Sequence, residues 1–368
     1  MRICVVSAFE ADSCLAHAIN TIKMAEGFAK AGHAVTVICR ETADGKHDAQ
    51  ELISQYGLRQ IINLNWIQLP HKCGDWKFSW LALYRIFKLR PDVIFARNYI
   101  VPFLTSVLGM PTIVESHAHP ANNTALFKLM VYGCRFSCMK ALVTISRVLA
   151  DNFIVKGVPE NKITIKPDAV DLELFMRPAQ LPPAPYERSK PIAIYAGHLY
   201  DYKGIPTVIQ AAKLLPEVEF HFIGGLPQDL ERQQARTAEL GVENVVFHGL
   251  KPHSIIPRYL WHADVLLLPP SQHHPSARWT SPVKLGEYLA SGVPVVASSI
   301  PALKDWLTEN EVAFFEPDNA HSLAAVVVKV LGDTKYAQAL RENAKEKALS
   351  LSYEKRAQAL LDEFILSK

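Results

Sequence analysis

Short apolar runs alternate with longer segments of helical spacing through the first half of the chain. Residues 2–7 form a largely apolar run typical of a buried strand, and residues 19–31 have a helical periodicity that ends at Gly32. The run at residues 34–39 predicts the next strand, so the chain opens with a β-α-β unit. The alternation continues with strands predicted around residues 92–96, 112–115 and 141–145.

A second series that begins with a strand occupies the other half of the chain. Residues 177–191 separate the two series; they contain five prolines and no apolar periodicity, which is typical of a linker or crossing segment. Residues 333–368 are polar and have helical spacing without a strand pattern. We therefore predict two doubly wound α/β domains, with ligands bound in a cleft between them at the carboxyl ends of the strands. The strands of the second series are predicted at residues 191–197, 218–225, 245–250, 263–269 and 293–298.

Composition limits the class of protein. The 368 residues, 49% of them hydrophobic and 20% charged, suffice for two ordinary cores. The six cysteines form no CxxC pair and no repeated metal spacing, so we interpret them as reduced core thiols of a cytoplasmic protein. The first apolar run is too short for a signal peptide, and no run approaches the ~20 residues of a membrane span. A soluble or at most peripheral protein is expected.

Positive charge is concentrated in the first half. Residues 1–178 contain 20 Lys and Arg against 15 Asp and Glu, whereas residues 179–368 have a net charge of −2. Within residues 72–147, ten basic residues stand against three acidic ones and are interleaved with aromatic residues, most densely at residues 76–90. Such a surface can rest on an anionic membrane. No nucleic-acid recognition motif accompanies the charge, so nucleic acid is not an expected partner. The alternative is an ordinary helix that packs on its own domain through Trp80, Leu83, Tyr84 and Phe87.

The stretch TSPVKLGEYLASGVPVVAS, residues 280–298, predicts a short helix followed directly by a buried strand. Pro282 suits the first helical turn, where its missing N–H costs no hydrogen bond, and Gly292 suits the left-handed residue that ends a helix. Because the N-terminus of a helix attracts negative charge, this turn is a candidate anion site. Thr280, Ser281 and Lys284 lie close to it.

Five segments that follow one another along the chain resemble the GT-B glycosyltransferases and, among them, the retaining glycosyltransferase family 4. Residues 281–298 are similar to the most recognisable region of that family, in its Ser-Pro-x-Lys-x-x-Glu variant. The other segments are ALVTISRVLADNFIVKGVPENKITIKPDAVDLELF (141–175), IYAGHLYDYKG (194–204), HFIGG (221–225) and VVFHGLKPHSIIPRYLWHADVLLLPPS (245–271).

The resemblance implies a GT-B fold, in which two Rossmann-like α/β domains face a central cleft. Residues 1–178 would form the acceptor-side domain, and residues 179–345 the domain that binds the nucleotide sugar. Residues 346–368 would form a C-terminal helix that crosses back to the first domain.

The resemblance also implies how a donor diphosphate is neutralised without a metal ion. Lys203 matches the lysine of the family's first loop in the second domain, and His198 stands where an arginine is usual, so a titratable group replaces a fixed cation. Glu287 matches the glutamate that accepts hydrogen bonds from the ribose hydroxyls. The alternatives are an ordinary loop lysine for Lys203 and a surface glutamate paired with a lysine for Glu287. The other implied donor-binding residues are Gly197, Gly249, Leu250, Thr280, Ser281 and Lys284.

Some positions depart from the family pattern. Trp279 occupies the position of a glutamate that contacts the donor sugar, and Leu15 and Ala16 occupy the position of a Gly-Gly phosphate loop. His117 matches the family's histidine near the transferred sugar, where an imidazole can donate a hydrogen bond to a hydroxyl or to developing charge. His119 is the alternative occupant of that position.

The implied reaction is a metal-independent, retaining transfer of a sugar from a nucleoside diphosphate sugar to a hydroxyl group of a glycan or lipid-linked acceptor, without a cofactor. His117, Lys203 and Glu287 are the expected catalytic residues. Polysaccharide biosynthesis is the expected setting, in the cytoplasm or peripherally at the inner face of a membrane. One alternative is a GT-B nucleotide-sugar epimerase, which needs acid/base carboxylates. The other is a non-catalytic subunit that binds sugar nucleotides, motivated by the replaced arginine and glutamate.

Overall fold

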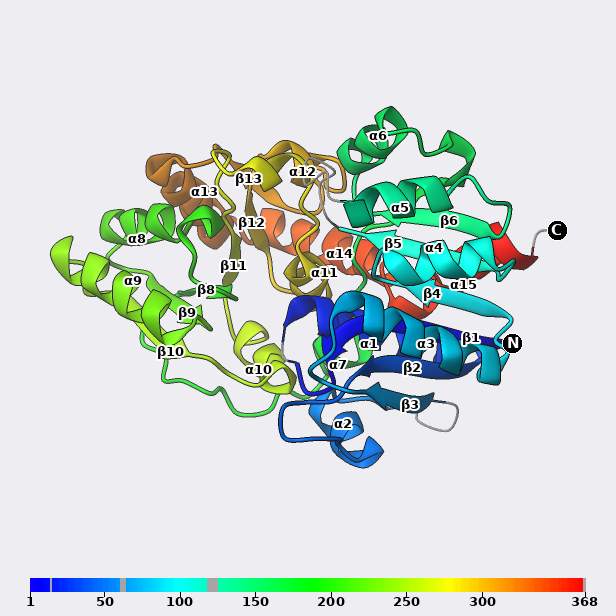
Figure 1. Cartoon of the computed structure of the whole chain (residues 1–368). Helices are drawn as coiled ribbons and strands as arrows, with labels where there is room; N and C mark the ends of the chain where they lie inside the picture. Colours follow the sequence, from blue (N-terminus) through cyan, green and yellow to red (C-terminus); the bar gives the residue numbers. More distant parts are fainter. Residues whose placement is uncertain (14, 60–63, 118–124, 367–368) are drawn as a thin grey trace. The chain divides into compact units, whose positions relative to one another are not determined.

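The chain divides into two compact units in a computed structural model. Unit 1 contains Met1–Ala169 and the C-terminal residues from Ser352, and unit 2 contains Val170–Leu351 (Figure 1). From the sequence we predicted the first division after residue 178, which is later in the chain than observed. We predicted the second division after residue 345, which is earlier than observed. The structure describes residues 1–13, 15–59, 64–117 and 125–366.

Unit 1 is built on a parallel sheet with the strand order β3-β2-β1-β4-β5-β6-β7. The order reverses between β1 and β4, and doubly wound sheets bind ligands at the carboxyl ends of the strands at such a point. The strands are β1 (Arg2–Glu10), β2 (Ala34–Arg40), β3 (Leu64–Leu69), β4 (Val93–Ala96), β5 (Thr112–Ser116), β6 (Met139–Thr144) and β7 (Ile163–Ile165). The helices are α1 (Ala16–Lys30), α2 (Ala49–Gln55), α3 (Asp75–Leu89), α4 (Ile100–Val107), α5 (Ala125–Gly133), α6 (Arg147–Val155) and α15 (Tyr353–Leu361), with short turns at Glu160–Lys162 and Asp362–Leu366.

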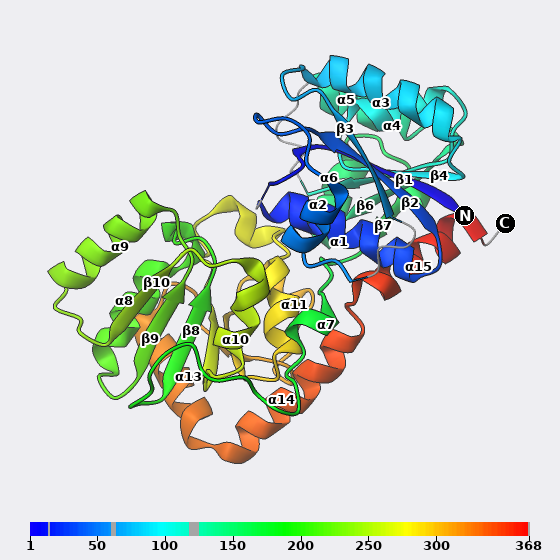
Figure 2. The same cartoon turned by 90° about the horizontal axis from the view of Figure 1, so that it is seen from below.

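Alternate side chains of the unit 1 strands pack on opposite faces of the sheet. In β1, Ile3 and Val5 join the core under α1, α2 and α15, whereas Cys4 and Val6 join the core under α3 and α4. Helices α5 and α6 pack over β5 and β6 on the same face as α3. Figure 2 shows α3, α4 and α5 together on one side of the sheet, with α1, α2 and α15 on the other.

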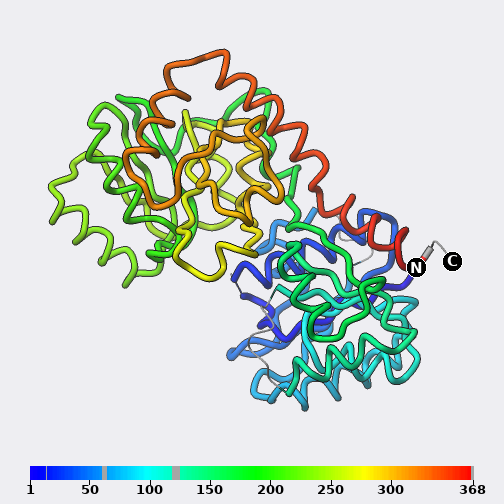
Figure 3. The backbone as a smooth tube through the Cα atoms, turned by 90° about the horizontal axis from the view of Figure 1, so that it is seen from above, coloured from blue at the N-terminus to red at the C-terminus, as the bar shows by residue number. Residues whose placement is uncertain are grey.

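The C-terminal helix α15 belongs to the core of unit 1. Tyr353 is buried beside α1, so close to Gly27 that a Cβ atom on Gly27 would lie 2.6 Å from the Tyr353 carbonyl oxygen. Residues far apart in sequence are therefore neighbours here, and Figure 3 shows the C-terminal segment in red beside the N-terminal segment in blue.

Unit 2 contains a second parallel sheet, with the order β10-β9-β8-β11-β12-β13 and its reversal between β8 and β11. The two doubly wound sheets that the sequence predicts are thus confirmed. The strands are β8 (Ile192–Ala196), β9 (Glu219–Ile223), β10 (Val245–Gly249), β11 (Val265–Leu268), β12 (Val295–Ser298) and β13 (Ala313–Phe315). The helices are α7 (Leu172–Phe175), α8 (Ile205–Leu214), α9 (Pro227–Glu239), α10 (Ile256–Leu260), α11 (Val283–Ala290), α12 (Pro301–Lys304), α13 (Ala320–Gly332) and α14 (Thr334–Leu349), with short turns at Asp201–Lys203, His253–Ile255 and Pro275–Arg278.

The Pro-rich segment is not an independent linker. The Tyr186 hydroxyl donates to the Tyr259 carbonyl oxygen at 3.1 Å, and Arg188 forms an ion pair with Asp264 at 2.6 Å. Helix α7, which precedes this segment, packs into the same core through the buried Phe175. These contacts assign the segment to unit 2 and explain why the division of the chain precedes it.

The predicted helix and strand after Thr280 are confirmed. Pro282 caps the N-terminus of α11, and Gly292 follows the helix with φ +67°, in the left-handed region that favours glycine. The strand β12 then lies between β11 and β13, with its residues fully buried. The fold therefore places the start of α11 at the carboxyl end of the unit 2 sheet.

Candidate functional site

Two half-buried lysines gather at the carboxyl end of the unit 2 sheet. Lys203 ends the turn after β8, and Lys284 lies in the first turn of α11; both line one small pocket together with Tyr195, Tyr202 and Thr280. The Lys284 Nζ atom lies 3.8 Å from the centroid of the Tyr195 ring. Among the described residues, no carboxylate forms an ion pair with either ammonium group.

Burial lowers the pKa of both lysines. The pKa of Lys284 lies well below its usual value because the group is buried and because Lys203 is near, and Glu287 opposes the shift only in part. Burial alone lowers the pKa of Lys203. Two desolvated cations side by side are stabilised by an anion that contacts both, so the pocket has the electrostatic character of an anion site.

The loop after β8 is shaped to admit the Lys284 ammonium group. Gly197 has φ +137°, and a Cβ atom there would lie 2.7 Å from Lys284 Nζ. His198, the next residue, stacks on Tyr200 with ring centroids 5.1 Å apart. The stack continues through Tyr202 to His274, so four parallel rings join this loop to the turn that precedes α11.

His198, the titratable group that stands where the family has an arginine, lies half-buried in this loop. Burial first, and then the charges of Lys284 and Lys203, lower the pKa of His198 below its usual value, although Asp229 opposes this. The imidazole is therefore neutral near pH 7 and acts as a stacking group. Lys284 is the second lysine that lines the pocket.

Glu287 is a buried carboxylate and not the surface glutamate of the alternative interpretation. It lies one turn after Lys284 in α11 and is 9% exposed. Its Oε1 atom is 2.8 Å from Nε2 of His253, whose ring rests against Phe175. Its Oε2 atom makes no hydrogen bond to the described residues, so it can accept one from a ligand.

The remaining donor-site candidates are distributed over the same edge of the sheet. Thr280 lines the lysine pocket, and Ser281 is buried beside it. Trp279 lies half-buried directly after the turn Pro275–Arg278, and its backbone N–H donates to the Ser276 carbonyl oxygen at 3.0 Å. Gly249 ends β10 at the sheet's margin and Leu250, which is 69% exposed, follows it; neither residue lines the pocket.

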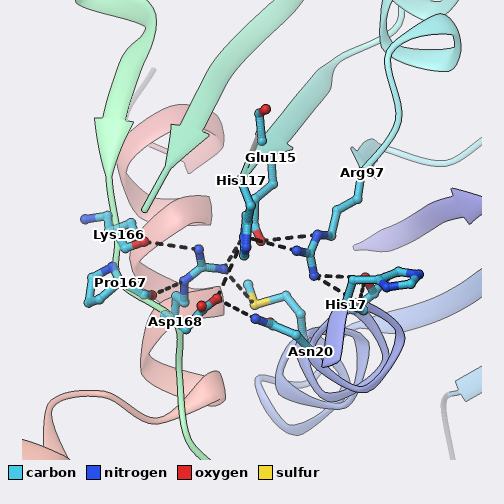
Figure 4. A network of polar contacts seen from close by, with 12 residues as sticks. His17, Asn20, Arg97, Glu115, His117, Lys166, Pro167 and Asp168 are labelled. Atoms are coloured by element: carbon cyan, nitrogen blue, oxygen red, sulfur yellow. Dashed lines mark hydrogen bonds and ion pairs between the residues drawn. The ribbon is translucent and has the colours of Figure 1, made fainter. Parts of the chain in front are cut away.

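A second polar cluster lies at the carboxyl ends of the unit 1 strands, around His117 (Figure 4). Its Nε2 atom is 2.7 Å from Glu115 Oε1 and 3.7 Å from Asp168 Oδ1. Arg97, which follows β4, approaches the same Nε2 atom at 3.1 Å. Because Nε2 is engaged by these neighbours and Nδ1 bonds to none of the described residues, Nδ1 is the atom that can face a ligand. His119 lies outside the described residues.

The C-terminal helix closes this cluster. Arg356 of α15 donates to Glu115 Oε2 at 2.7 Å, and its Nε donates to the Pro167 carbonyl oxygen at 2.9 Å. Burial raises the pKa of Glu115, but the guanidinium groups of Arg356 and Arg97 and the hydrogen bond from His117 outweigh it and hold that pKa well below its usual value. Glu115 is therefore an ionised support for His117.

Glu115, His117 and Asp168 are also close enough together to ligate a metal ion, with ligand atoms within 4.8 Å of one another. The guanidinium groups of Arg97 and Arg356 both form ion pairs with Glu115, so a cation at this carboxylate would have to compete with them. Asn20 of α1 holds Asp168 by a hydrogen bond. These contacts fit a positioning network better than a metal site.

The phosphate-loop candidates lie at the start of α1. Leu15 is the N-terminal cap residue, 54% exposed, and Ala16 is the first residue of the helix. Among the described residues, the first turn of α1 contains no acidic side chain. The helix N-terminus is thus open to an anion, at the carboxyl end of β1.

Sequence reasoning missed several residues of both clusters. His253 lies within the segment quoted above for residues 245–271, but only its contact with Glu287 identifies it. Arg356 and Asn20 approach their partners from other helices, and no local sequence signal marks them.

Two family models match the chain. The model described as Glycosyltransferase Family 4 matches residues 20–174, and the model described as Glycosyl transferases group 1 matches residues 179–347. The chain is 29% identical over 202 residues to the amylovoran biosynthesis glycosyltransferase AmsK of Erwinia amylovora, covering 53% of this chain and 48% of AmsK. The chain spans about half the length of the curated relatives it matches.

Solved structures share the fold at lower sequence identity. Sucrose-phosphate synthase from Thermosynechococcus elongatus has a TM-score of 0.76 at 19% identity, covering 98% of this chain and 97% of that chain. Anabaena Alr3699/HepE in complex with UDP-glucose has a TM-score of 0.74 at 15% identity, covering 99% of this chain and 100% of that chain. Both units therefore have the Rossmann-like arrangement of these structures.

Proposed function

We propose a specific reaction for this chain, which belongs to the GT-B glycosyltransferases of the family 4 type: transfer of a sugar from a nucleoside diphosphate sugar to a hydroxyl group of a glycan or lipid-linked acceptor. The relative AmsK is named for the biosynthesis of amylovoran, and WcaL of Escherichia coli (strain K12), 29% identical over 189 residues, is named as a putative glycosyltransferase of colanic acid biosynthesis. Polysaccharide biosynthesis is therefore the proposed setting. The donor class is supported by Alr3699/HepE, whose structure contains UDP-glucose.

The lysine pair carries this proposal. A leaving nucleoside diphosphate needs positive charge on its phosphate oxygens, and Lys203 and Lys284 line one pocket with lowered pKa values and no carboxylate partner among the described residues. Glu287 lies one helical turn further on, with an oxygen available to a ribose hydroxyl. Together these groups suit a diphosphate and its nucleoside without a resident metal ion or cofactor.

We assign the transfer a retaining course. In that course the acceptor oxygen bonds to the anomeric carbon on the face that the diphosphate leaves, and a donor phosphate oxygen takes the acceptor's proton. His117 would bind the transferred sugar through Nδ1, because its Nε2 atom is held by Glu115 and Arg97. The ion-paired Glu115 is a poor proton donor or acceptor, which favours transfer over the epimerase alternative.

The proposed place of action is the cytoplasm or the inner face of a membrane. Four of the five described cysteines are buried, which fits core thiols. Within the described part of the chain, no helix has the length and apolar character needed to cross a bilayer.

Thermal-shift measurements with UDP, GDP, ADP and dTDP test the donor site. A matching nucleotide at 100 times its Kd should stabilise the protein by about 2.7 kcal/mol. Lys203→Met and Lys284→Met should each reduce the shift to about half or less, whereas Lys213→Met, an exposed lysine of α8 in the same unit, should preserve it. Equal shifts in all three variants would contradict the lysine assignment.

Product analysis separates the remaining alternatives. Incubation with the donor should yield free nucleoside diphosphate, and NMR should show the donor's anomeric configuration in the product. Conversion of the donor to its epimer would establish the epimerase instead. Binding without turnover across a panel of donors and acceptors would favour the non-catalytic subunit.

A further inference from the structure

Helix α3 exposes a stripe of aromatic side chains along its length. Its buried face, which includes Phe78, Ala82 and Ile86, packs on the sheet. The exposed aromatic residues lie on a different face, and they are Trp76 (48% exposed), Trp80 (57%), Tyr84 (53%) and Phe87 (50%).

The helical period explains why these residues form one stripe. At 3.6 residues per turn, spacings of four, four and three residues keep the four rings within about 80° of arc, along a helix about 22 Å long. The interpretation that Trp80, Tyr84 and Phe87 pack on their own domain is therefore wrong, and only Leu83 of that set is buried. The sheet holds α3 through its other face, so the core does not need the stripe.

Basic side chains flank the stripe. Lys77, Arg85 and Lys88 are exposed on α3, and Asp75 at its start is the one acidic residue of the helix. The Lys88 Nζ atom lies 4.5 Å from the centroid of the Tyr84 ring, and the Arg85 guanidinium lies 5.9 Å from it. Rings and cations thus occupy one continuous surface.

The neighbouring helices extend this surface. Helices α4 and α5 lie beside α3 on the same face of the sheet (Figure 2). These helices and the residues just after them add exposed apolar side chains at Val107, Leu108 and Tyr132, and exposed basic ones at Lys128 and Arg135. We call the exposed side chains of α3, α4 and α5 the aromatic-basic face.

We propose that the aromatic-basic face docks on a bilayer that contains anionic phospholipids. Trp and Tyr rings have an apolar body and a polar edge, which suits the boundary between headgroups and acyl chains. The surrounding Lys and Arg side chains complement anionic headgroups. A second copy of this chain is a poorer occupant, because a two-fold contact through this face would oppose its own positive charges.

Vesicle co-sedimentation tests this docking surface without any assumption about the transfer reaction. The wild type should pellet with phosphatidylcholine vesicles that contain 30% phosphatidylglycerol, remain in the supernatant with pure phosphatidylcholine, and be released by 0.5 M NaCl. The tryptophan emission should shift to the blue as Trp76 and Trp80 enter the interface. Failure to bind the anionic vesicles, or equal binding to both compositions, would overturn the proposal.

Matched variants locate the binding surface. At about 1 kcal/mol per charge, the triple change Lys77→Gln, Arg85→Gln and Lys88→Gln should weaken partitioning about a hundredfold. A Trp80→Ser, Phe87→Ser variant should weaken it and remove most of the emission shift. The control neutralises three exposed lysines of unit 2, by changing Lys213, Lys335 and Lys345 to Gln, and should bind as the wild type does.

Two further outcomes would identify a different occupant. Equal partitioning by the α3 variants and the control would overturn the assignment of the surface. Light scattering that shows a dimer, dissociated by the Trp80→Ser, Phe87→Ser change, would establish a second copy as the occupant. Circular dichroism verifies that each variant is folded, as expected for exposed positions.

Discussion

Removal of the Arg356 guanidinium should lower the free energy of unfolding of unit 1 by more than most single substitutions do. Arg356→Met keeps most of the apolar stem but leaves Glu115 with Arg97 as its remaining guanidinium partner, at 3.4 Å. Both side chains of the lost pair are buried, at 5% and 1% exposure. Breaking such a pair costs about 3–5 kcal/mol. We expect a value near the lower end, about 3 kcal/mol, since Arg97 and His117 remain in place.

Urea unfolding followed by circular dichroism measures this cost, with a second transition fitted where the two units unfold separately. The double variant Arg356→Met, Glu115→Gln should recover part of the loss, because the Glu115 charge is no longer left without Arg356, although Arg97 then loses its own carboxylate partner. Arg356→Lys should retain part of the stability. A loss below about 1 kcal/mol, or strictly additive single losses, would refute the account of the cluster.

The pH dependence gives an independent test of the same pair. The folded-state pKa of Glu115 is depressed, so its contribution to stability is present above the unfolded value and is lost as pH falls through the folded value. Without Arg356 that folded pKa should rise, and the variant should lose stability at a higher pH than the wild type. The difference in free energy of unfolding between the wild type and the Arg356→Met variant should therefore shrink in acid. A constant difference in this free energy down to pH 3 would contradict the reasoning.

Further predictions concern the donor site. Glu287→Ala and Lys203→Ala should each lose about ten- to a hundredfold in donor affinity or turnover while Tm is retained, because a charge-assisted hydrogen bond contributes ~1.5–3 kcal/mol; full activity in either variant would remove that residue from the site. EDTA should leave turnover unchanged, and a loss restored by Mn²⁺ or Mg²⁺ would show that a metal takes part. Since the pKa of Lys284 is lowered, donor affinity should fall as pH rises, at pH values below those at which an ordinary lysine titrates, and a profile that falls only where ordinary lysines titrate would oppose this assignment. His253→Ala should weaken donor binding and His253→Gln should restore part of it, as isothermal titration can show.

Local patterns in the sequence predicted most of the fold. The turn at Pro282, the left-handed Gly292 and the buried strand after it follow from steric rules within a few residues. The strands β3, β7 and β13 were missed because they are short or mix polar and apolar residues.

The site was predictable only where its residues share a motif. Lys203, Lys284 and Glu287 lie in local segments that resemble a family, whereas Arg356 and Glu115 are 241 residues apart in the chain. The aromatic stripe of α3 shows a different limit. Its periodicity indicates two apolar faces, and only the packing of the sheet decides which of them is buried.

The position of α15 has a consequence for the order of synthesis. All of unit 2, Val170–Leu351, leaves the ribosome before the residues from Ser352 that complete the unit 1 core. Until then, Glu115 lacks its Arg356 partner and the apolar surface of α1 that contacts α15 is uncovered. Unit 2 can thus fold as one continuous segment, whereas unit 1 completes its core last and should depend more on chaperones. Ribosome-bound chains stopped before residue 352 should expose the α1 face of unit 1 to protease.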